Sequence, residues 1–376
     1  MSTMTPVTIK DMSDVLLYNI ELYIQKATFE QPSGWQFKNR NYKKFKELIV
    51  NNTNLIKKAS RKMRNLKITV AFYEELFKRN NIKSPSNIKK IEKLYALYFH
   101  NVGIETTAIT TTNTKEKTYI LPDLQEFAES PSAGAIQIFN NIYGIGPAKI
   151  KTLISKNILT IEQLREALEN EPKLLNNKQK MGLRHYEDLN ERIPRSEITK
   201  FNRDILKLLK DNYGEDINMT ITGSYRRGAK TSGDIDMLIT SRKYEGKALD
   251  MVLKLLIDRG IICENLAKGK KKFMGVIRVS PDSKARHLDI IETTPSDYPY
   301  AILYFTGSAQ HNIEMRRKAL TLGYSLNEYD MTIKGTKSRV PSEKIREKIG
   351  KDECETEEDI FQFLDMKYKE PRKRIK

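Results

Sequence analysis

Residues 221–240 read ITGSYRRGAKTSGDIDMLIT, and this stretch decides the fold and chemistry expected of the chain. Asp234 and Asp236 stand two residues apart at the start of an apolar run, so in a strand both carboxylates project from one face. Neighbouring carboxylates repel each other, and burial worsens the repulsion unless cations lie between them. Because Mg²⁺ prefers oxygen ligands and combines few carboxylates with substrate phosphates, the pair predicts a divalent-metal site.

The turn that precedes the carboxylates suits phosphate groups. Gly223 and Ser224 lead into Tyr-Arg-Arg-Gly, which offers backbone N–H groups, a hydroxyl and guanidinium groups to phosphate oxygens. With the carboxylates, this turn predicts a two-metal nucleotidyl-transfer site. The alternative is a β-hairpin in which Ser-Gly-Asp is only a turn and Asp236 a solvated strand residue, but GS…RRG…SGDID is far more specific than a lone D-x-D.

Composition limits the class of protein. A chain of 376 residues can bury a sizeable core and is expected to hold two to four modules. Cys263 and Cys354 supply no disulfide framework, which indicates a reducing cellular compartment. Four histidines without a C-x-x-C pair argue against a structural zinc site. No stretch is long and apolar enough to span a membrane, and residues 1–10 lack the apolar core of a signal peptide.

The net charge of +18 is concentrated near the N-terminus, where residues 36–100 carry 17 Lys and Arg against 4 Glu. Such a surface attracts polyanions through counterion release. The alternative explanations are solvated Lys-rich helices or a charge-biased coding sequence. Together with a phosphate-and-metal motif, the charge makes nucleic acid the leading partner.

A second motif lies in NIYGIGPAKI, residues 141–150. Gly144 and Gly146 allow close backbone approach, and Pro147 opens a helix whose N-terminal N–H groups can face a phosphate, as in a helix-hairpin-helix. The same turn could also simply join two helices.

Hydrophobic spacing outlines a helical N-terminal half and a mixed second half. Asp289 lies amid apolar neighbours near a strand, and because an isolated buried Asp is costly, a metal or a partner is expected beside it. If it faces Asp234 and Asp236, this third carboxylate would complete the ligand set of a two-ion site. A Thr-rich linker is expected at residues 105–118, and a solvated basic tail at residues 367–376. Helices are predicted at residues 14–26, 42–51, 69–80, 87–100, 199–213 and 248–259, and strands at 219–222, 235–240, 273–279 and 287–293.

The pieces, in this order, resemble the family X DNA polymerases, the family of DNA polymerases beta and lambda. The resemblance covers residues 135–376 and is weak over residues 1–130. It rests on NIYGIGPAKI (141–150), ERIPRSE (191–197), GSYRRGAKTSGDID (223–236), KFMGVIRV (272–279), RHLDII (286–291), YFTGSAQHN (304–312), NEYDM (327–331) and DIFQFLDMKYKEPR (359–372).

The resemblance implies an α+β multidomain fold. The expected parts are a basic helical N-terminal domain that binds DNA 5′ ends (1–130), a helical, fingers-type helix-hairpin-helix subdomain (131–192), a nucleotidyltransferase palm with a mixed β-sheet (193–295) and a small α+β C-terminal subdomain for the nucleotide and nascent base pair (296–376).

The resemblance also implies roles for individual residues. Two Mg²⁺ ions, with Mn²⁺ as the alternative, would be held by the three aspartates, of which Asp289 would also take the proton of the primer 3′-hydroxyl. A monovalent cation could sit at the hairpin, where Gly144, Gly146 and Ala148 would grip DNA. The nucleotide would be bound by Arg192, Ser224, Arg227, Gly233, Tyr304, Phe305, Gly307, Asn312 and Arg316.

By the same resemblance the N-terminal domain would be a 5′-deoxyribose-phosphate lyase, which needs a Lys amine for Schiff-base formation. Lys93 would be the nucleophile, with Lys38, Tyr42 and Lys89 in support. The glycines of the family's first hairpin are missing there, so a Lys that merely grips DNA is the alternative.

Departures from the family pattern matter too. His287 and Ile291 replace arginines of the beta-type enzyme, and the AKGKKK turn (267–272) is short where template-independent relatives carry a longer loop. We therefore expect a monomeric, template-directed polymerase that fills gapped or nicked double-stranded DNA with dNTPs in base excision repair. It would work in a DNA-containing compartment: the nucleus, or the cytoplasm if the chain is viral, as its abundant Lys, Asn and Ile hint. The rivals are a template-independent nucleotidyltransferase and a DNA-binding scaffold with a degenerate site.

Overall fold

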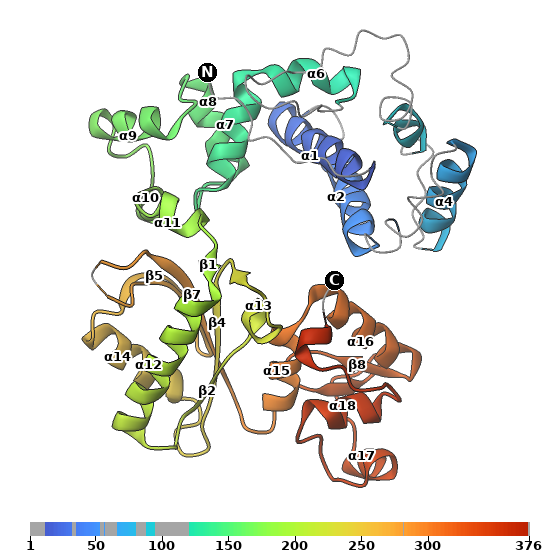
Figure 1. Ribbon diagram of the computed structural model, residues 1–376, viewed down its shortest axis with the longest axis vertical. Coiled ribbons are helices and arrows are strands. Elements are labelled where there is room, and N and C mark those ends of the chain that lie inside the picture. Colours follow the sequence, from blue (N-terminus) through green and yellow to red (C-terminus); the bar gives the residue numbers. More distant parts are fainter. Residues whose placement is uncertain are drawn as a thin grey trace. The chain divides into compact units, whose positions relative to one another are not determined.

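The computed structural model describes residues 12–31, 35–52, 56, 66–79, 88–94, 120–280 and 282–374 (Figure 1). The chain divides into two compact units, Met1–Arg184 and His185–Lys376, here called the N-terminal and the C-terminal unit. No helix within the described ranges combines the length and apolar character needed to cross a membrane.

The first part of the N-terminal unit is a pair of helices, α1 (Met12–Glu30) and α2 (Trp35–Asn51), with α6 (Pro122–Glu129) packed against α1. Helices α1 and α2 pack against each other, and both contribute buried side chains, among them Leu16 and Phe45. The amide of Asn19 accepts a buried hydrogen bond of 2.8 Å from the backbone N–H of Leu121, which fixes the start of α6. The other helices here are α4 (Leu66–Arg79) and a helical stretch over residues 88–94.

The second part of the unit holds the predicted hairpin between α7 (Pro131–Asn140) and α8 (Pro147–Ser155). Gly144 has a φ of +84°, which an L side chain rarely adopts, and its carbonyl accepts 3.1 Å from the Gln179 amide. Gly182 lies so close to this turn that a β-carbon on it would be 2.2 Å from the carbonyl oxygen of Tyr143. Helices α9 (Ile161–Asn170) and α10 (Asn177–Arg184) complete the unit.

The C-terminal unit is organised by a five-stranded mixed sheet of order β2-β4-β7-β6-β5. The central pair β4 and β7 is parallel and the other pairs are antiparallel. The strands are β2 (Asn218–Ile221), β4 (Ile235–Thr240), β5 (Ile262–Lys268), β6 (Lys272–Ile277) and β7 (Arg286–Thr293), beside a short ladder of β1 (Ile193–Pro194) with β3 (Thr231–Ser232).

The two faces of this sheet have different neighbours. Alternate residues of β4 and β7, including Met237 and Ile290, share one core with helices α12 (Arg195–Tyr213) and α14 (Ala248–Asp258). The opposite face contributes Leu238, which packs on α15 (Tyr298–Thr306). This alternation leaves the second face of β4 and β7 free to present polar side chains near α15.

The C-terminal part packs around a core that includes Phe361 and Phe363. It contains α15, α16 (Ala309–Thr321), the hairpin β8 (Tyr324–Leu326) with β9 (Met331–Ile333), α17 (Ser342–Ile349), α18 (Glu357–Phe363) and a 3₁₀ turn, Pro371–Lys373. Short helices α11 (Tyr186–Asn190) and α13 (Gly223–Arg226) lie at the start of the unit and after β2.

The predicted α+β multidomain class is confirmed, with a helical first half and a mixed sheet in the second. The strands expected at 219–222, 235–240, 273–279 and 287–293 appear with shifts of a few residues, whereas β5 was not anticipated because its residues lack a clear apolar alternation. The linker expected at residues 105–118 lies outside the described residues.

The close approach of Gly182 to Tyr143 gives a stability prediction. We expect Gly182→Ala to lower the free energy of unfolding by about 1–3 kcal/mol, because overpacking against backbone outweighs the helix propensity gained. Gly146→Ala is the matched control, since nothing beyond its two chain neighbours lies within 4 Å of its added β-carbon. Thermal unfolding followed by circular dichroism measures both, and equal melting temperatures for the Gly182 variant and wild type would contradict the contact.

Candidate active site

Two carboxylates stand side by side on the face of the sheet that α12 and α14 do not cover, and a third lies just before them in the chain. Asp236 of β4 is the register partner of Asp289 of the parallel strand β7, so their side chains stand side by side. Asp234 lies just before β4, two residues from Asp236, rather than within the strand. Since β4 and β7 are central strands, these positions are set by backbone pairing on both sides.

The surroundings of Asp236 raise its proton affinity. Burial, followed by the charges of Asp234 and Asp289, raises the pKa of Asp236 to about 7. Lys272 of β6 partly compensates, because its ammonium lies 2.8 Å from a carboxylate oxygen of Asp289. Crowded acidic oxygens of this kind are the donor set that divalent cations favour.

As they stand, no three Asp, Glu, His or Cys side chains of the described residues converge enough to hold a metal ion. The chemistry of the aspartates fits a divalent cation, while the contact of Lys272 with Asp289 must open for that carboxylate to become a ligand. His287, on the same face two residues from Asp289, has a pKa lowered mainly by burial.

A glycine turn lies directly against this carboxylate face. Gly223 has a φ of +56°, and a β-carbon on it would be 2.1 Å from the carboxylate of Asp236. The backbone N–H of Thr222 donates 2.8 Å to the carbonyl of Asp236. Only glycine therefore fits this position, and the helix α13 that it opens is held beside β4.

The predicted phosphate-binding residues surround α13. The hydroxyl of Ser224 donates 2.7 Å to the hydroxyl of Ser232, and Arg227 donates 2.6 Å to the carbonyl of Thr306 at the end of α15. Burial lowers the pKa of Arg227. Gly307 follows Thr306, and a β-carbon added to it would be 3.3 Å from the Arg227 guanidinium.

Arg192 approaches the same region from the β1–β3 ladder. Its Nε and Nη2 donate to Thr231, at 3.1 Å to the hydroxyl and 2.7 Å to the carbonyl. A β-carbon on Gly233 would lie 3.6 Å from the Arg192 guanidinium. Thr231, Ser232 and Lys272 were missed from the sequence, because their roles depend on strand pairing rather than on a motif.

The predicted nucleotide and template residues of the C-terminal part form one contact group. Tyr304 and Phe305 meet edge to face at 5.0 Å, and Asn312 donates 2.8 Å to the carbonyl of Tyr304. The Arg316 guanidinium lies 5.0 Å from the Tyr304 ring centre and 3.8 Å from Glu328. These side chains are thus held by one another along α15 and α16.

At the hairpin of the N-terminal unit, Gly146 caps α8 with open space around it, and Ala148 is exposed in the first turn. Gly144 supports the turn through its carbonyl. The helix N-terminus therefore has room for a close approach of a phosphate backbone.

The predicted lyase residues are placed less closely together. Lys89 and Lys93 are exposed on the helical stretch 88–94, and the side chain of Lys38 lies outside the described part. Tyr42 stacks on Tyr23 at 4.9 Å. The ammonium that covers these rings belongs to Lys90, at 5.0 Å from Tyr23 and 5.5 Å from Tyr42, a residue that the sequence did not single out.

Three protein-family models match consecutive segments of the chain. Models of the fingers domain of DNA polymerase lambda, the DNA polymerase beta palm and the DNA polymerase beta thumb match residues 137–190, 192–295 and 301–375. DNA polymerase lambda of Rattus norvegicus is 31% identical over 258 residues, which are 65% of this chain and 43% of that protein.

Two further relatives are DNA polymerase lambda of Arabidopsis thaliana and DNA-directed DNA/RNA polymerase mu of Homo sapiens. They are 27% and 25% identical, each over 68% of this chain, and the matches cover 49% and 55% of those proteins. The chain thus spans about half the length of the curated relatives it matches.

The raised pKa of Asp236 gives a pH prediction for the metal-free protein. A carboxyl whose folded-state pKa is raised stabilises the fold below about pH 4, and this contribution is lost as pH rises through about 7. We expect Asp236→Asn to melt about 2–4 °C or more above wild type at pH 8, with the difference vanishing near pH 4. Thermal scans in EDTA measure it, and a pH-independent difference would show that repulsion is not the cause.

Proposed function

The chain belongs to family X of the DNA polymerases, and we propose that it extends a primer 3′ end across short gaps in double-stranded DNA. The observation that carries the proposal is the side-by-side placement of Asp236 and Asp289 against the Gly223 turn. Gapped or nicked DNA and dNTPs are the proposed substrates, and base excision repair is the proposed setting. A monomer acting where DNA is kept, such as the nucleus, is part of the proposal.

Each group has a physical task in this reaction. Asp234, Asp236 and Asp289 would hold Mg²⁺, or Mn²⁺ in its place, which supplies Lewis-acid stabilisation to the phosphoryl oxygens. The carboxylate of Asp289, once Lys272 has released it, would accept or relay the proton of the primer 3′-hydroxyl.

The remaining residues orient the nucleotide. Ser224, Arg227 and the backbone of Gly233 would bind the β- and γ-phosphates, and Arg192 would add positive charge as pyrophosphate leaves. Tyr304 and Phe305 would lie against the sugar, while Asn312 and Arg316 would reach the minor-groove edges of the base pair and template. Most of the rate enhancement would come from positioning and electrostatics.

DNA would be gripped through its backbone by the hairpin at Gly144, Gly146 and Ala148, where a monovalent cation is also proposed. The net charge of +18 supports such binding through counterion release. The loop between β5 and β6 is short, with the N–H of Gly269 bonded 2.7 Å to the carbonyl of Lys272, which favours templated synthesis over free extension.

Primer extension on gapped duplex DNA tests the proposal. We expect Asp289→Ala to lower the single-turnover rate by at least about 10²–10³-fold, because the variant loses a metal ligand and the acceptor of the 3′-hydroxyl proton together. Asp258→Ala, an exposed aspartate on α14, is the control and should extend like wild type.

Wild-type-like extension by Asp289→Ala would refute the mechanism. Extension of single strands without template, at rates rivalling gapped DNA, would instead favour a template-independent enzyme. Tight DNA binding without incorporation by the wild type would favour a scaffold.

A lyase in the N-terminal unit is the second candidate activity. The ammonium of Lys90 lies over the rings of Tyr23 and Tyr42 there. Two aromatic ring faces stabilise the charged form of an amine, which makes it a poor nucleophile. Exposed Lys93 therefore remains the proposed nucleophile, with Lys38, Tyr42 and Lys89 in support.

Borohydride trapping on a 5′-deoxyribose-phosphate substrate tests the lyase. We expect the wild type to form a covalent adduct, Lys93→Ala to abolish it, and Lys90→Ala to retain it. Trapping that persists in Lys93→Ala would assign the chemistry to another lysine.

A further inference from the structure

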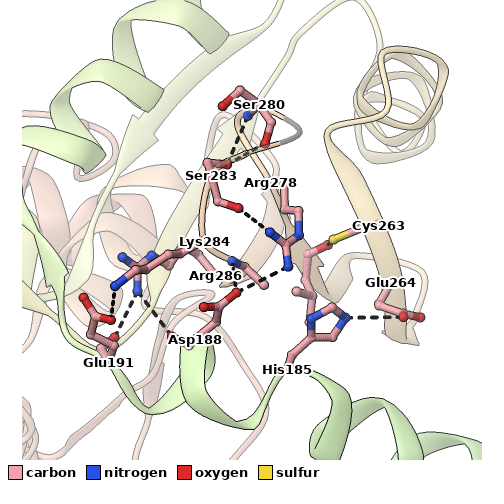
Figure 2. Close-up of polar contacts among 12 residues, drawn as sticks. His185, Asp188, Glu191, Cys263, Glu264, Arg278, Ser280, Ser283, Lys284 and Arg286 are labelled. Atoms are coloured by element: carbon pink, nitrogen blue, oxygen red, sulfur yellow. Dashed lines mark hydrogen bonds and ion pairs between the residues drawn. The ribbon is translucent and has the colours of Figure 1, made fainter.

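Arg286, the first residue of β7, is one of the two largest fully buried side chains of the described residues, with 2% of its surface exposed. Its guanidinium makes four hydrogen bonds. Nε and Nη2 donate 2.7 and 2.9 Å to the two carboxylate oxygens of Glu197, and Nη1 donates 3.2 Å to each of the carbonyls of Asp188 and Glu191. Figure 2 shows Arg286 beside Asp188 and Glu191.

These partners lie on either side of one short segment. Asp188 and Glu191 precede β1, and Glu197 follows it in the first turn of α12. The planar fork of Arg286 therefore holds the chain at both ends of β1, through bonds in fixed directions. Arg192 is the residue directly after the bonded carbonyl of Glu191.

Arg192 itself has little else to fix its direction. It is exposed, and its described hydrogen bonds are those to Thr231, which pairs with Pro194 across the β1–β3 ladder. The direction of its guanidinium toward Gly233 hence depends on where the backbone of residues 188–197 is held.

Stability alone does not require this arrangement. A buried ion pair can often be replaced by apolar side chains without loss of stability, because desolvation offsets the attraction. What an apolar side chain cannot do is hold two carbonyls and a carboxylate at set angles.

We infer that Arg286 is a positioning residue for nucleotidyl transfer, which acts by holding the Arg192 guanidinium in place before the nucleotide arrives. The inference rests on the proposed function. It assigns a role in the reaction to a side chain that touches neither DNA nor nucleotide.

A double-mutant cycle tests the inference by single-turnover gap filling over a range of dNTP concentrations. Arg192→Ala is expected to slow incorporation by about 10–10²-fold, as for the loss of a hydrogen bond to a charged group. Arg286→Met alone should slow incorporation by nearly the same factor. In the Arg192→Ala background it should slow incorporation further by less than about 3-fold. Thermal unfolding shows whether each variant is folded, and Arg286→Met/Glu197→Gln replaces the single variant if that one is not.

The matched control is Arg278→Met. Arg278 belongs to the same polar cluster, bonding the carbonyl of Ser283 and the carboxylate of Asp188, but it touches neither Glu191 nor Glu197 (Figure 2). It should keep the wild-type rate.

The outcomes separate the two proposals. Additive losses for Arg286→Met and Arg192→Ala, a wild-type rate for Arg286→Met, or an equal loss for Arg278→Met would overturn the inference while leaving the polymerase intact. A wild-type protein that does not extend gapped DNA at all would overturn the proposed function and this inference with it.

Discussion

The parallel pairing of β4 with β7 is the constraint on which the rest of the site in the C-terminal unit depends. It places Asp236 opposite Asp289 on one face of the sheet, where burial and the neighbouring negative charges raise the pKa of Asp236. The same pairing turns Met237 and Ile290 toward α12 and α14, which supply the core on the other face. One register therefore determines both what is buried and what is available for chemistry.

Everything near the carboxylates adapts to that register. The carboxylate of Asp236 occupies the space that a side chain on residue 223 would need, so only glycine fits there. Helix α13 can therefore begin directly against β4. Lys272 reaches Asp289 from the neighbouring strand and provides the positive charge that the acidic face needs without a cation. Arg286 sits on the same strand as Asp289, three residues earlier, and connects that strand to the segment of Arg192. The site is thus a set of charges held by backbone pairing rather than by flexible loops.

How far the sequence predicts such a site depends on the distance over which its parts interact. The Asp234 and Asp236 spacing, the glycine turn and the strand at residues 235–240 are local patterns, and each could be recognised from neighbouring residues. The hairpin at residues 141–150 is local for the same reason. Strand β5 was missed because its residues show no clear alternation of apolar and polar side chains, and it is defined by its pairing with β6. In the N-terminal unit, the resemblance to the family selected Lys89 and Lys93, yet the tyrosine rings meet Lys90, which lies on a different face of the same helix.

The sequence by itself determined the carboxylate pair and the phosphate-binding turn, because each lies within a few neighbouring residues. It also determined the basic charge and the resemblance to family X, because composition and the order of motifs along the chain do not depend on folding. Only the tertiary structure decided which distant groups share a space. The pairing of Lys272 with Asp289 and the four bonds of Arg286 join segments up to 98 residues apart. Such contacts follow from the order and register of the strands, and no periodicity within one segment records them.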